Sequence, residues 1–394
     1  MKPSIAWITY DLPYPPNSGG KHRAFNLIKY LSRDFDIHLF SFYRNEKQLL
    51  YLDELKLFAS QIHVYKRRSV WDLRNLLLNT LHPMPLLNLS YRDNTLKRDL
   101  VKSALNGQFQ LYHFEFLGAA DYMPDIKKAG GRVLMGNENV EYKIYAAYTK
   151  NSKFRPLVPF YKYDVWKMGK FERKLWKLAD ENIAVCGDDA SEVMSVSGRP
   201  CHVVPNGVEI KPNYPLSHSA SPVAFFSGNL NYQQNRNAVL WFMENVFPLV
   251  RKEIPEFKLV VLSNSRPGFA NDYGYGLEIL GDERTTFDML SPKACVFVSP
   301  IWIKSGTNIK VLQAASCGLP IVGTSASLTG YDFENEKDVL ICDTPDTFAQ
   351  GVTRIIGDVK LQQRLSSGAF EKVKKYSWEN SARILKDVYS KILS

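Results

Sequence analysis

The stretch that decides the fold is KSGTNIKVLQAASCG, residues 304–318. It follows the apolar run ACVFVSP and precedes LPIV, so the pattern predicts a strand, a glycine turn and then a helix. Thr307 or Ser305 is expected to cap the start of this helix, and Gly318 suits the position just after its end. The residues expected on its buried face are Val311, Leu312 and Ala315.

The start of this helix is predicted to bind an anion. Free backbone N–H groups near Gly306, Thr307 and Asn308, together with the helix dipole, favour negative charge. Lys310 adds a full positive charge in the first turn, and Gln313 lies one turn further on, where its amide can bond a hydroxyl. A phosphate that carries a sugar satisfies this pattern. An ordinary capped helix with a solvated lysine is an equally open interpretation of these residues alone.

The alternation of strand and helix continues along the chain. The predicted strands are IAWITY (5–10), DIHLFSFY (36–43), QLYHFEF (110–116), RVLMG (132–136), NIAVC (182–186), VAFFSG (223–228) and FKLVVLS (257–263), followed by LEILG, CVFVS, PIVGTS and DVLIC. This order predicts two α/β halves with mostly parallel sheets, separated by a turn and a linker at 203–222. Each half opens with a strand, a glycine loop and a helix, and the loops contain Gly19, Gly20 and Gly228.

Several common site types are excluded by spacing. The loop NSGG is not a dinucleotide fingerprint, and GGKH has neither the spacing nor the Ser/Thr of a P-loop. The sequence has no H-E-x-x-H motif and no Cys/His cluster typical of a zinc site. We therefore expect no metal and no bound cofactor.

The composition favours a cytoplasmic protein with anionic partners. The net charge is +10, the five cysteines are scattered, and neither a signal peptide nor a membrane-spanning run is expected. Basic and aromatic residues alternate at 65–74 and at 160–177, a composition that suits peripheral contact with an anionic membrane. At 65–90 this interpretation is as open as that of an ordinary helix face. At 160–177 we favour a solvated face with its aromatic residues packed inward.

The chain resembles the retaining glycosyltransferases of family 4, which have the GT-B fold. The similarity includes PPNSGGKHRAFNLIKYLS, VPNGVE, SGNLNYQQNRNAVLWFMENVFPLV, PIWIKSGTNIKVLQAASCGLPIV and YSWENSARIL. It implies two Rossmann-like domains whose parallel sheets face each other across a cleft. Residues 1–205 would bind the acceptor and 206–375 the nucleotide-sugar, and a helix over 376–394 would cross back to the first domain. No metal is implied, because side-chain and helix N-terminal charges hold the diphosphate.

Site residues follow from the resemblance by position. Gly19 and Gly20 would let the first loop approach the donor phosphates. Arg236 and Lys310, with the N–H groups of Thr307 and Asn308, would hold the diphosphate and stabilise it as it leaves.

The chain departs from the family pattern at several places. Ser305 and Gln313 stand where many members have a Glu-x7-Glu pair, and the second acid there normally binds the ribose. Glu138 falls where similar proteins place a histidine beside the reacting sugar, so it is a candidate catalytic residue. Glu141 is a second candidate for a catalytic role, and Glu138 can also be a simple helix-start acid before VEYKIYAAY. On the strand QLYHFEF (110–116), Glu115 is expected to hold an acceptor hydroxyl and His113 to be a satisfied buried histidine.

The sequence thus predicts transfer of a sugar from a nucleotide-sugar to a glycan or lipid-linked acceptor, with retention at the anomeric carbon, in cell-surface polysaccharide synthesis. No contact with nucleic acid is expected. Two alternatives stay open. One is a degenerate family member that binds a nucleotide-sugar or a partner enzyme without turnover. The other is a sugar-nucleotide epimerase, which shares the two-domain fold.

Overall fold

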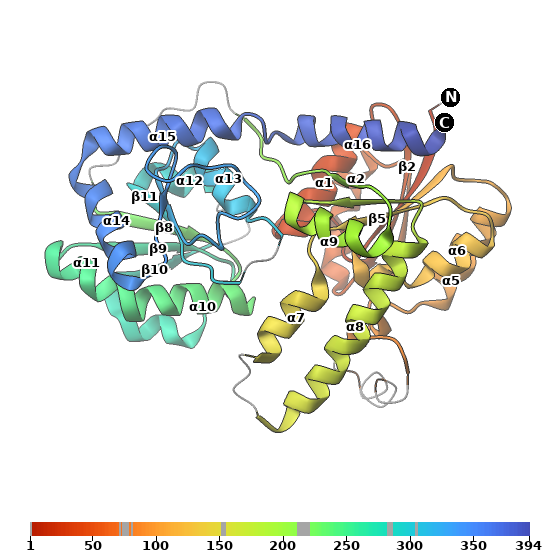
Figure 1. Ribbon diagram of the computed structural model, residues 1–394, viewed down its shortest axis with the longest axis horizontal. Coiled ribbons are helices and arrows are strands. Elements are labelled where there is room, and N and C mark those ends of the chain that lie inside the picture. Colours follow the sequence, from red (N-terminus) through yellow and green to blue (C-terminus); the bar gives the residue numbers. More distant parts are fainter. Residues whose placement is uncertain are drawn as a thin grey trace. The chain divides into compact units, whose positions relative to one another are not determined.

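The structure, a computed structural model, describes residues 2–70, 72, 79, 82–150, 155–210, 221–281, 287–303 and 306–394. Ser305, residues 211–220 of the predicted linker and the middle of the stretch at 65–90 therefore lie outside the described residues. The chain divides into two compact units (Figure 1). Unit 1 comprises Met1–Pro205 and Trp378–Ser394, and unit 2 comprises Asn206–Ser377.

Unit 1 is built on a parallel sheet with the strand order β3-β2-β1-β4-β5-β6-β7. Its strands are β1 (Ser4–Thr9), β2 (Asp36–Tyr43), β3 (Gln61–Lys66), β4 (Leu111–Phe114), β5 (Val133–Asn137), β6 (Glu181–Ala184) and β7 (Cys201–Val203). Its helices include α1 (Gly19–Leu31), α2 (Leu52–Lys56), α4 (Leu86–Leu89), α5 (Asn94–Leu105), α6 (Met123–Lys128), α7 (Glu141–Lys150), α8 (Val158–Leu178), α9 (Gly187–Ser197) and α16 (Trp378–Leu393).

The central strand of unit 1 is covered on both faces. Ile5, Ala6, Trp7 and Ile8 have no exposed surface, as expected for a parallel strand between two layers of helices. Ala6 and Ile8 belong to the main core of the unit, and Trp7 on the opposite face packs against the ring of Tyr389 on α16. The last helix of the chain is thus part of the core of unit 1, where it packs beside α1.

Unit 2 has a second parallel sheet, with the order β10-β9-β8-β11-β12-β13. Its strands are β8 (Val223–Ser227), β9 (Lys258–Leu262), β10 (Leu277–Leu280), β11 (Val296–Ser299), β12 (Ile321–Gly323) and β13 (Leu340–Ile341). Its helices include α10 (Gln233–Trp241), α11 (Phe247–Glu253), α12 (Phe287–Leu290), α13 (Ile309–Ser316), α14 (Pro345–Gly357) and α15 (Val359–Val373). Successive residues of β8 point into different cores, Phe225 into one and Phe226 into the other.

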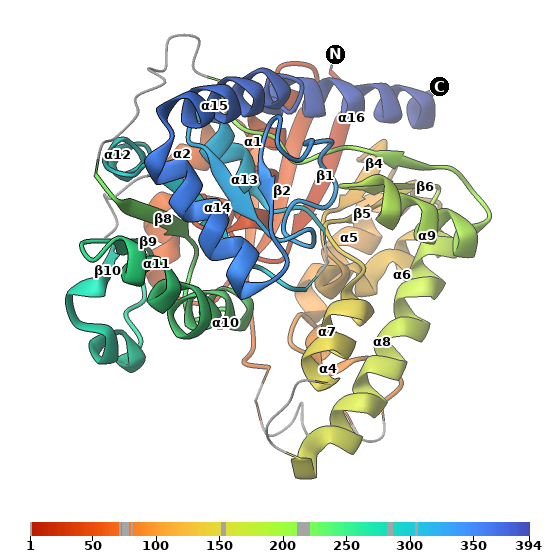
Figure 2. The ribbon, with the colours of Figure 1, turned by 60° about the vertical axis from the view of Figure 1, so that its left-hand side comes forward.

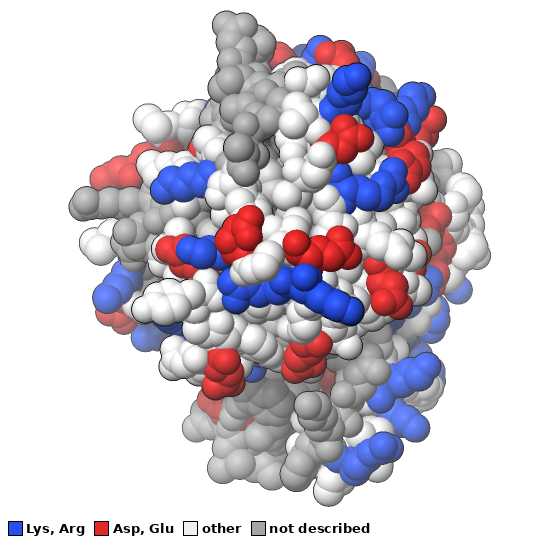
Figure 3. All heavy atoms as spheres, turned by 90° about the vertical axis from the view of Figure 1, so that its left-hand side faces the viewer, with Lys and Arg blue, Asp and Glu red and all other residues white. Residues whose placement is uncertain are grey.

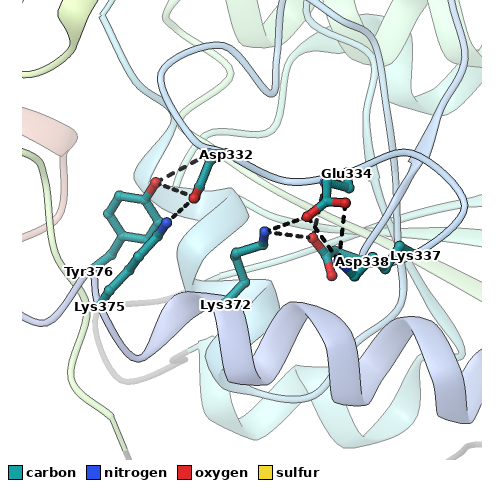
Figure 4. Close-up of polar contacts among 7 residues, drawn as sticks. All are labelled: Asp332, Glu334, Lys337, Asp338, Lys372, Lys375 and Tyr376. Atoms are coloured by element: carbon teal, nitrogen blue, oxygen red, sulfur yellow. Dashed lines mark hydrogen bonds and ion pairs between the residues drawn. The ribbon is translucent and has the colours of Figure 1, made fainter.

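Ionic contacts fix a loop of unit 2 to the end of α15. Lys375 and the Tyr376 hydroxyl bind the Asp332 carboxylate, and Lys372 pairs with Glu334 at 2.9 Å (Figure 4). Near the start of unit 2, Val208 donates its backbone N–H to the Tyr376 carbonyl at 2.8 Å. The points where the chain enters and leaves unit 2 are therefore held together within that unit.

Both sheets reverse their strand order next to the first strand of the unit. In unit 1 the reversal lies between β1 and β4, and in unit 2 between β8 and β11. Loops that leave the carboxyl ends of such strand pairs diverge to opposite sides of the sheet and leave room for a ligand. This topology places candidate sites at the loops after β1 and β8, where the sequence has its glycines.

Candidate functional site

The reversal point of unit 2 brings several of the predicted residues together. Lys310, in the first turn of α13, donates from Nζ to Asn235 Oδ1 at 2.7 Å, and Nζ lies 4.4 Å from the centre of the Phe226 ring. A Cβ atom added to Gly228 would lie 2.6 Å from Asn235 Nδ2 and 2.8 Å from Lys310 Nζ. The loop after β8 therefore needs glycine at this position, because the lysine and the asparagine fill the space.

The charge of Lys310 is not compensated by a carboxylate of the described residues. Its one hydrogen bond goes to a neutral amide, and burial lowers the pKa of its ammonium to about 7. A phosphate in contact with Nζ would supply the missing negative charge and restore the ordinary pKa. The geometry thus favours the anion site over the solvated lysine.

The start of α13, one to four residues before Lys310, has no side-chain cap. Gly306 has a φ of +53°, and Asn308 is the N-cap residue. The Asn308 side chain makes no cap bond and donates instead to the Ser327 carbonyl, while Thr307 Oγ1 accepts from Asn206 at 2.9 Å. The prediction of a Thr307 cap is therefore wrong, because its hydroxyl is used by a neighbouring loop. Without a side-chain cap, the first N–H groups of the helix stay available to a ligand.

The end of α13 matches the prediction. Gly318 has a φ of +64°, its N–H donates to Ala315, and the N–H of Leu319 donates to Ala314. These bonds are a Schellman motif, which requires a residue in the left-handed region and therefore favours glycine. Val311, Leu312 and Ala315 are fully buried, as expected.

The two remaining predicted residues of unit 2 lie on the two helices that carry Asn235 and Lys310. Arg236 is exposed on α10, where its Nε donates to the Leu230 carbonyl at 3.2 Å, and Gln313 is half-buried one turn after Lys310. The sequence reasoning missed Asn235, which positions the lysine. The signal for it was weak, a buried amide in a run of amides, NYQQNRN.

In unit 1 the structure places Glu138 against the first glycine loop. Glu138 follows β5, and a Cβ atom added to Gly20 would lie 2.6 and 2.8 Å from its carboxylate oxygens. The same atom would lie 2.5 Å from the hydroxyl oxygen of Tyr10. Gly20 is therefore required for the close approach of Glu138, whereas Gly19 is exposed at the start of α1.

The Glu138 carboxyl is unusual in its surroundings. Its Oε1 is buried and has no hydrogen-bond partner among the described residues. Burial, and after it the charge of Glu115, raise the pKa of Glu138 to about 8. The group is thus protonated at neutral pH and can donate a hydrogen bond, a property common at catalytic sites.

Glu141 lies at the start of α7, inside the protein. It is the first residue of α7 and is buried, and burial raises the pKa of its carboxyl to about 7. The group that caps α7 is Glu172, whose carboxylate accepts the N–H groups of Glu141 and Tyr142 at 3.0 and 3.1 Å. Glu141 thus lies in the first turn of α7, with its carboxyl held inside the protein.

The expectation that Glu115 holds an acceptor hydroxyl is wrong. Only 1 % of Glu115 is exposed, and its carboxylate pairs with Arg23 Nε at 2.5 Å and with His113 Nε2 at 2.7 Å. His113 is fully buried and contacts the Tyr389 hydroxyl through Nδ1, so the prediction of a satisfied buried histidine is confirmed. Arg23 also donates to the Val204 carbonyl at 2.9 Å. These partners leave Glu115 no surface for an acceptor.

A replacement of Glu138 with glutamine is expected to remove a pH-dependent loss of stability. Because the pKa of Glu138 is raised, the folded protein holds a proton that the unfolded chain loses near pH 4.3, so stability falls as the pH rises from there to about 8. Above pH 8 the glutamine variant should be more stable than the parent by about 1–3 kcal/mol. Urea unfolding at pH 6 and pH 9 measures this.

The control for this experiment is Glu46→Gln, which changes an exposed carboxylate of unit 1. It should leave the difference between the two pH values unchanged. Equal pH dependence in Glu138→Gln and the parent would show that Glu138 is ionised and solvated in the folded protein.

A comparison with known protein families found a match within unit 2. Residues 221–358 match the family model of glycosyl transferases group 1. Over these residues the chain is similar to the group 1 glycosyl transferases. The matched segment contains Gly228, Asn235, Gly306, Lys310 and Gln313, so the surroundings of Lys310 described above lie inside it.

The chain has the GT-B fold over its full length. HepE of Anabaena, solved with UDP and glucose, has a TM-score of 0.68 at 12 % identity, over 98 % of this chain and 99 % of HepE. A variant of S. aureus TarM, solved with fondaparinux, alpha-GlcNAc-glycerol and UDP, has a TM-score of 0.67 at 11 % identity over 100 % of both chains. The predicted fold class is confirmed.

A curated relative extends the similarity at the level of sequence. An uncharacterized 44.6 kDa protein in the cps region of Klebsiella pneumoniae is 22 % identical, over 93 % of this chain and 94 % of its own length. Within the described residues, no helix is long and apolar enough to span a membrane. The same described residues contain no group of three or more His, Cys, Asp or Glu side chains that could hold a metal ion.

Proposed function

We propose that the protein is a retaining glycosyltransferase that moves a sugar from a nucleotide-sugar to a glycan or lipid-linked acceptor. The observation that carries this proposal is the uncompensated charge of Lys310 beside the uncapped start of α13, at the strand reversal of unit 2. A diphosphate fits this position, because it can accept from the Nζ and from the backbone N–H groups at once. The nucleotide would then lie on unit 2.

The roles of the other residues follow from their surroundings. Lys310, Arg236 and the N–H groups of Thr307 and Asn308 stabilise the diphosphate as its bond to the anomeric carbon breaks, where negative charge develops. Positive side chains and the helix start replace a metal in this role. Gln313 bonds the ribose hydroxyls, and Gly228 and Gly306 let the backbone approach the nucleotide.

Glu138 is the candidate catalytic group of unit 1. In its protonated form the carboxyl donates a hydrogen bond to the reacting sugar, and ionised it stabilises positive charge at the anomeric carbon. The acceptor hydroxyl attacks from the side that the diphosphate leaves. Its proton passes to the leaving phosphate oxygen, so this step requires no strong protein base.

The setting we propose is cell-surface polysaccharide synthesis in the cytoplasm, next to the membrane. The relative in the cps region and the complexes of HepE and TarM with UDP support it. The +10 charge of the chain suits an anionic donor and an anionic membrane surface. We propose no nucleic-acid partner and no cofactor.

The proposal is tested by incubating the purified protein with a panel of nucleotide-sugars. We expect saturable binding of one nucleotide by calorimetry and slow release of that nucleotide diphosphate from its sugar donor. Binding without turnover, with or without added acceptor glycans, would identify a non-catalytic binder. If no nucleotide binds, the proposal is wrong.

Replacing Gln313 with glutamate is expected to tighten nucleotide binding. A carboxylate accepts ribose hydroxyls more strongly than an amide, and the difference should be roughly fivefold in Kd, or about 1 kcal/mol. Calorimetry with the nucleoside diphosphate measures it. The control, Gln350→Glu, adds the same charge to an exposed site on α14 and should leave Kd unchanged. Weaker binding in the Gln313 variant would place this side chain away from the ribose.

A further inference from the structure

We propose that the exposed face of one helical hairpin, α7 with the segment Arg155–Leu178, docks onto an anionic lipid surface. The two helices pack side by side and extend away from the sheet of unit 1 (Figures 1 and 2). We call them the α7–α8 hairpin. The choice of lipid as the partner rests on the proposed function, because a lipid-linked acceptor lies at a membrane surface. The face itself is defined by where its charged residues lie, because the carboxylates are buried and the cations are exposed.

The carboxylates of the hairpin are all buried, as far as its residues are described. Glu141, Asp164 and Glu172 are 6 %, 9 % and 0 % exposed. Each has a partner inside the protein, since Glu172 caps α7, Asp164 accepts the Leu86 N–H at 2.9 Å, and Glu141 accepts from Asn139. The outer face of the hairpin therefore has no negative charge of its own.

The cations of the same hairpin lie outside. Six of them are exposed and form no ion pair with a described residue, namely Lys150, Arg155, Lys162, Lys170, Lys174 and Lys177. Two further exposed cations, Lys143 and Arg173, lie close to Glu192 of α9, which pairs with Lys143. A set of unpaired cations on one projecting element creates a positive potential that attracts anionic lipid headgroups.

Two aromatic side chains are exposed among these cations. Tyr163 is 43 % and Trp166 is 53 % exposed, whereas Trp176 on the same helix is fully buried. The expectation that the aromatic residues of 160–177 pack inward is therefore right for Trp176 and wrong for the other two. Tyrosine and tryptophan are the residues that prefer the boundary between water and lipid.

The packing of this aromatic pair favours lipid over nucleic acid. The rings of Tyr163 and Trp166 stack on each other, with centroids 5.8 Å apart, and Lys170 Nζ lies 3.9 Å from the Trp166 ring centre. Because these ring faces already have partners, they do not form the open platforms on which bases stack. Their apolar edges remain exposed between the cations, as an interfacial helix requires.

The described part of the alternative stretch at 65–90 does not offer a comparable face. In its described part, Leu86, Leu87 and Leu89 are buried, and the Arg67 guanidinium lies over the Tyr91 ring at 4.3 Å. The surface on the side of unit 2 also differs, because acidic and basic groups alternate there (Figure 3). Pairs such as Arg354–Glu336 and Lys372–Glu334 neutralise each other in that unit.

The test is sedimentation of the full-length protein with vesicles of phosphatidylcholine alone and with added phosphatidylglycerol, at low and high salt and without nucleotide. We expect binding only to the anionic vesicles, weakened by salt. The double variant Lys162→Glu and Lys170→Glu should bind at least about tenfold more weakly. Tyr163→Ser with Trp166→Ser should lose binding several-fold. Both changes lie on the surface and leave the core intact.

The matched control is Lys252→Glu with Lys360→Glu, which makes the same charge change on exposed residues of unit 2. It should bind vesicles like the parent. Equal losses in the control and the hairpin variant, or no binding of the parent at low salt, would overturn the proposal. So would a hairpin variant that binds vesicles normally but loses affinity for a single-stranded oligonucleotide. Because no donor is present, failure here is separate from failure of the transferase proposal, which nucleotide binding tests.

Discussion

Replacing Lys310 with alanine is expected to lower kcat/KM for donor hydrolysis by roughly 30- to 900-fold, which corresponds to about 2–4 kcal/mol of transition-state stabilisation. The magnitude is large because the Lys310 ammonium is desolvated and has no carboxylate partner among the described residues. The charge that develops on the leaving diphosphate would lose its main compensation. Steady-state release of the nucleoside diphosphate measures the effect.

Two further variants separate charge from position. Lys360→Ala removes an exposed lysine of α15 and should leave kcat/KM within about twofold. Asn235→Ala keeps the charge of Lys310 but removes the amide that holds Nζ at 2.7 Å, so its effect should lie between the two. A Lys310→Ala variant with the parent's kcat/KM would contradict the role proposed for this lysine.

The pH dependence of nucleotide binding checks the same residue. In the unliganded protein the pKa of Lys310 is about 7, so the ammonium loses its proton as the pH rises above that value. An anion binds the protonated form better, and its affinity should therefore decrease by up to about tenfold per pH unit above 7. The alanine variant should show no such decrease between pH 7 and pH 9, a range in which calorimetry is practical.

Replacing Arg23 with methionine is expected to reduce the free energy of unfolding of unit 1 by about 3–5 kcal/mol. The change leaves Glu115 buried without its closest cation, since Arg23 Nε lies 2.5 Å from the carboxylate and both side chains are almost fully buried. It also removes the donor to the Val204 carbonyl. Urea unfolding of the full chain, followed by circular dichroism, measures the loss.

A second change shows whether the uncompensated charge is the cause. Adding Glu115→Gln to Arg23→Met removes the buried charge and should recover part of the stability. The exposed pair of Lys56 and Asp53 is the control, and Lys56→Met should cost less than about 1 kcal/mol. Equal losses in Arg23→Met and Lys56→Met would show that the buried pair does not stabilise unit 1.

Lowering the pH should reduce the stability of the parent protein through protonation of Glu115. Burial alone would raise the pKa of Glu115, but Arg23 and His113 outweigh it and hold the pKa below its usual range. The stabilisation is therefore complete above the unfolded-state value near 4.3 and is lost as the pH falls through the lower folded-state value. The Arg23→Met variant should lose this dependence at acidic pH.

Most strands were predictable because a parallel sheet needs continuous apolar runs. IAWITY and VAFFSG became β1 and β8, which lie at the strand reversals of their sheets. The sequence reasoning missed β3 and β7, which end the sheet of unit 1 on either side. An edge strand is covered less completely, so its sequence, as in QIHVYK, lacks a continuous apolar run.

The candidate site was predictable in part. Gly228, Gly306 and Lys310 were found from sequence because the start of a helix after a glycine turn creates an anion site by local geometry alone. The role of Glu115 could not be found in this way. The prediction that Glu115 and His113 share one face of their strand was correct. However, Arg23, the cation that pairs with Glu115, lies 92 residues earlier in the chain.

The sequence by itself determined the order of strands and helices, the glycine after α13 and the positive helix start, since these depend on neighbours within a few residues. The tertiary structure decided which charges are compensated. Asn235 holds Lys310 from 75 residues away. The buried Oε1 of Glu138 has no hydrogen-bond partner among the described residues, and it lies beside Gly20, which belongs to another strand's loop. Burial and hydrogen bonds set the pKa of a side chain, and distant segments supply both. For this reason only the tertiary structure distinguishes the candidate reactive groups, Glu138 and Lys310, from Glu115, whose ion pair stabilises unit 1.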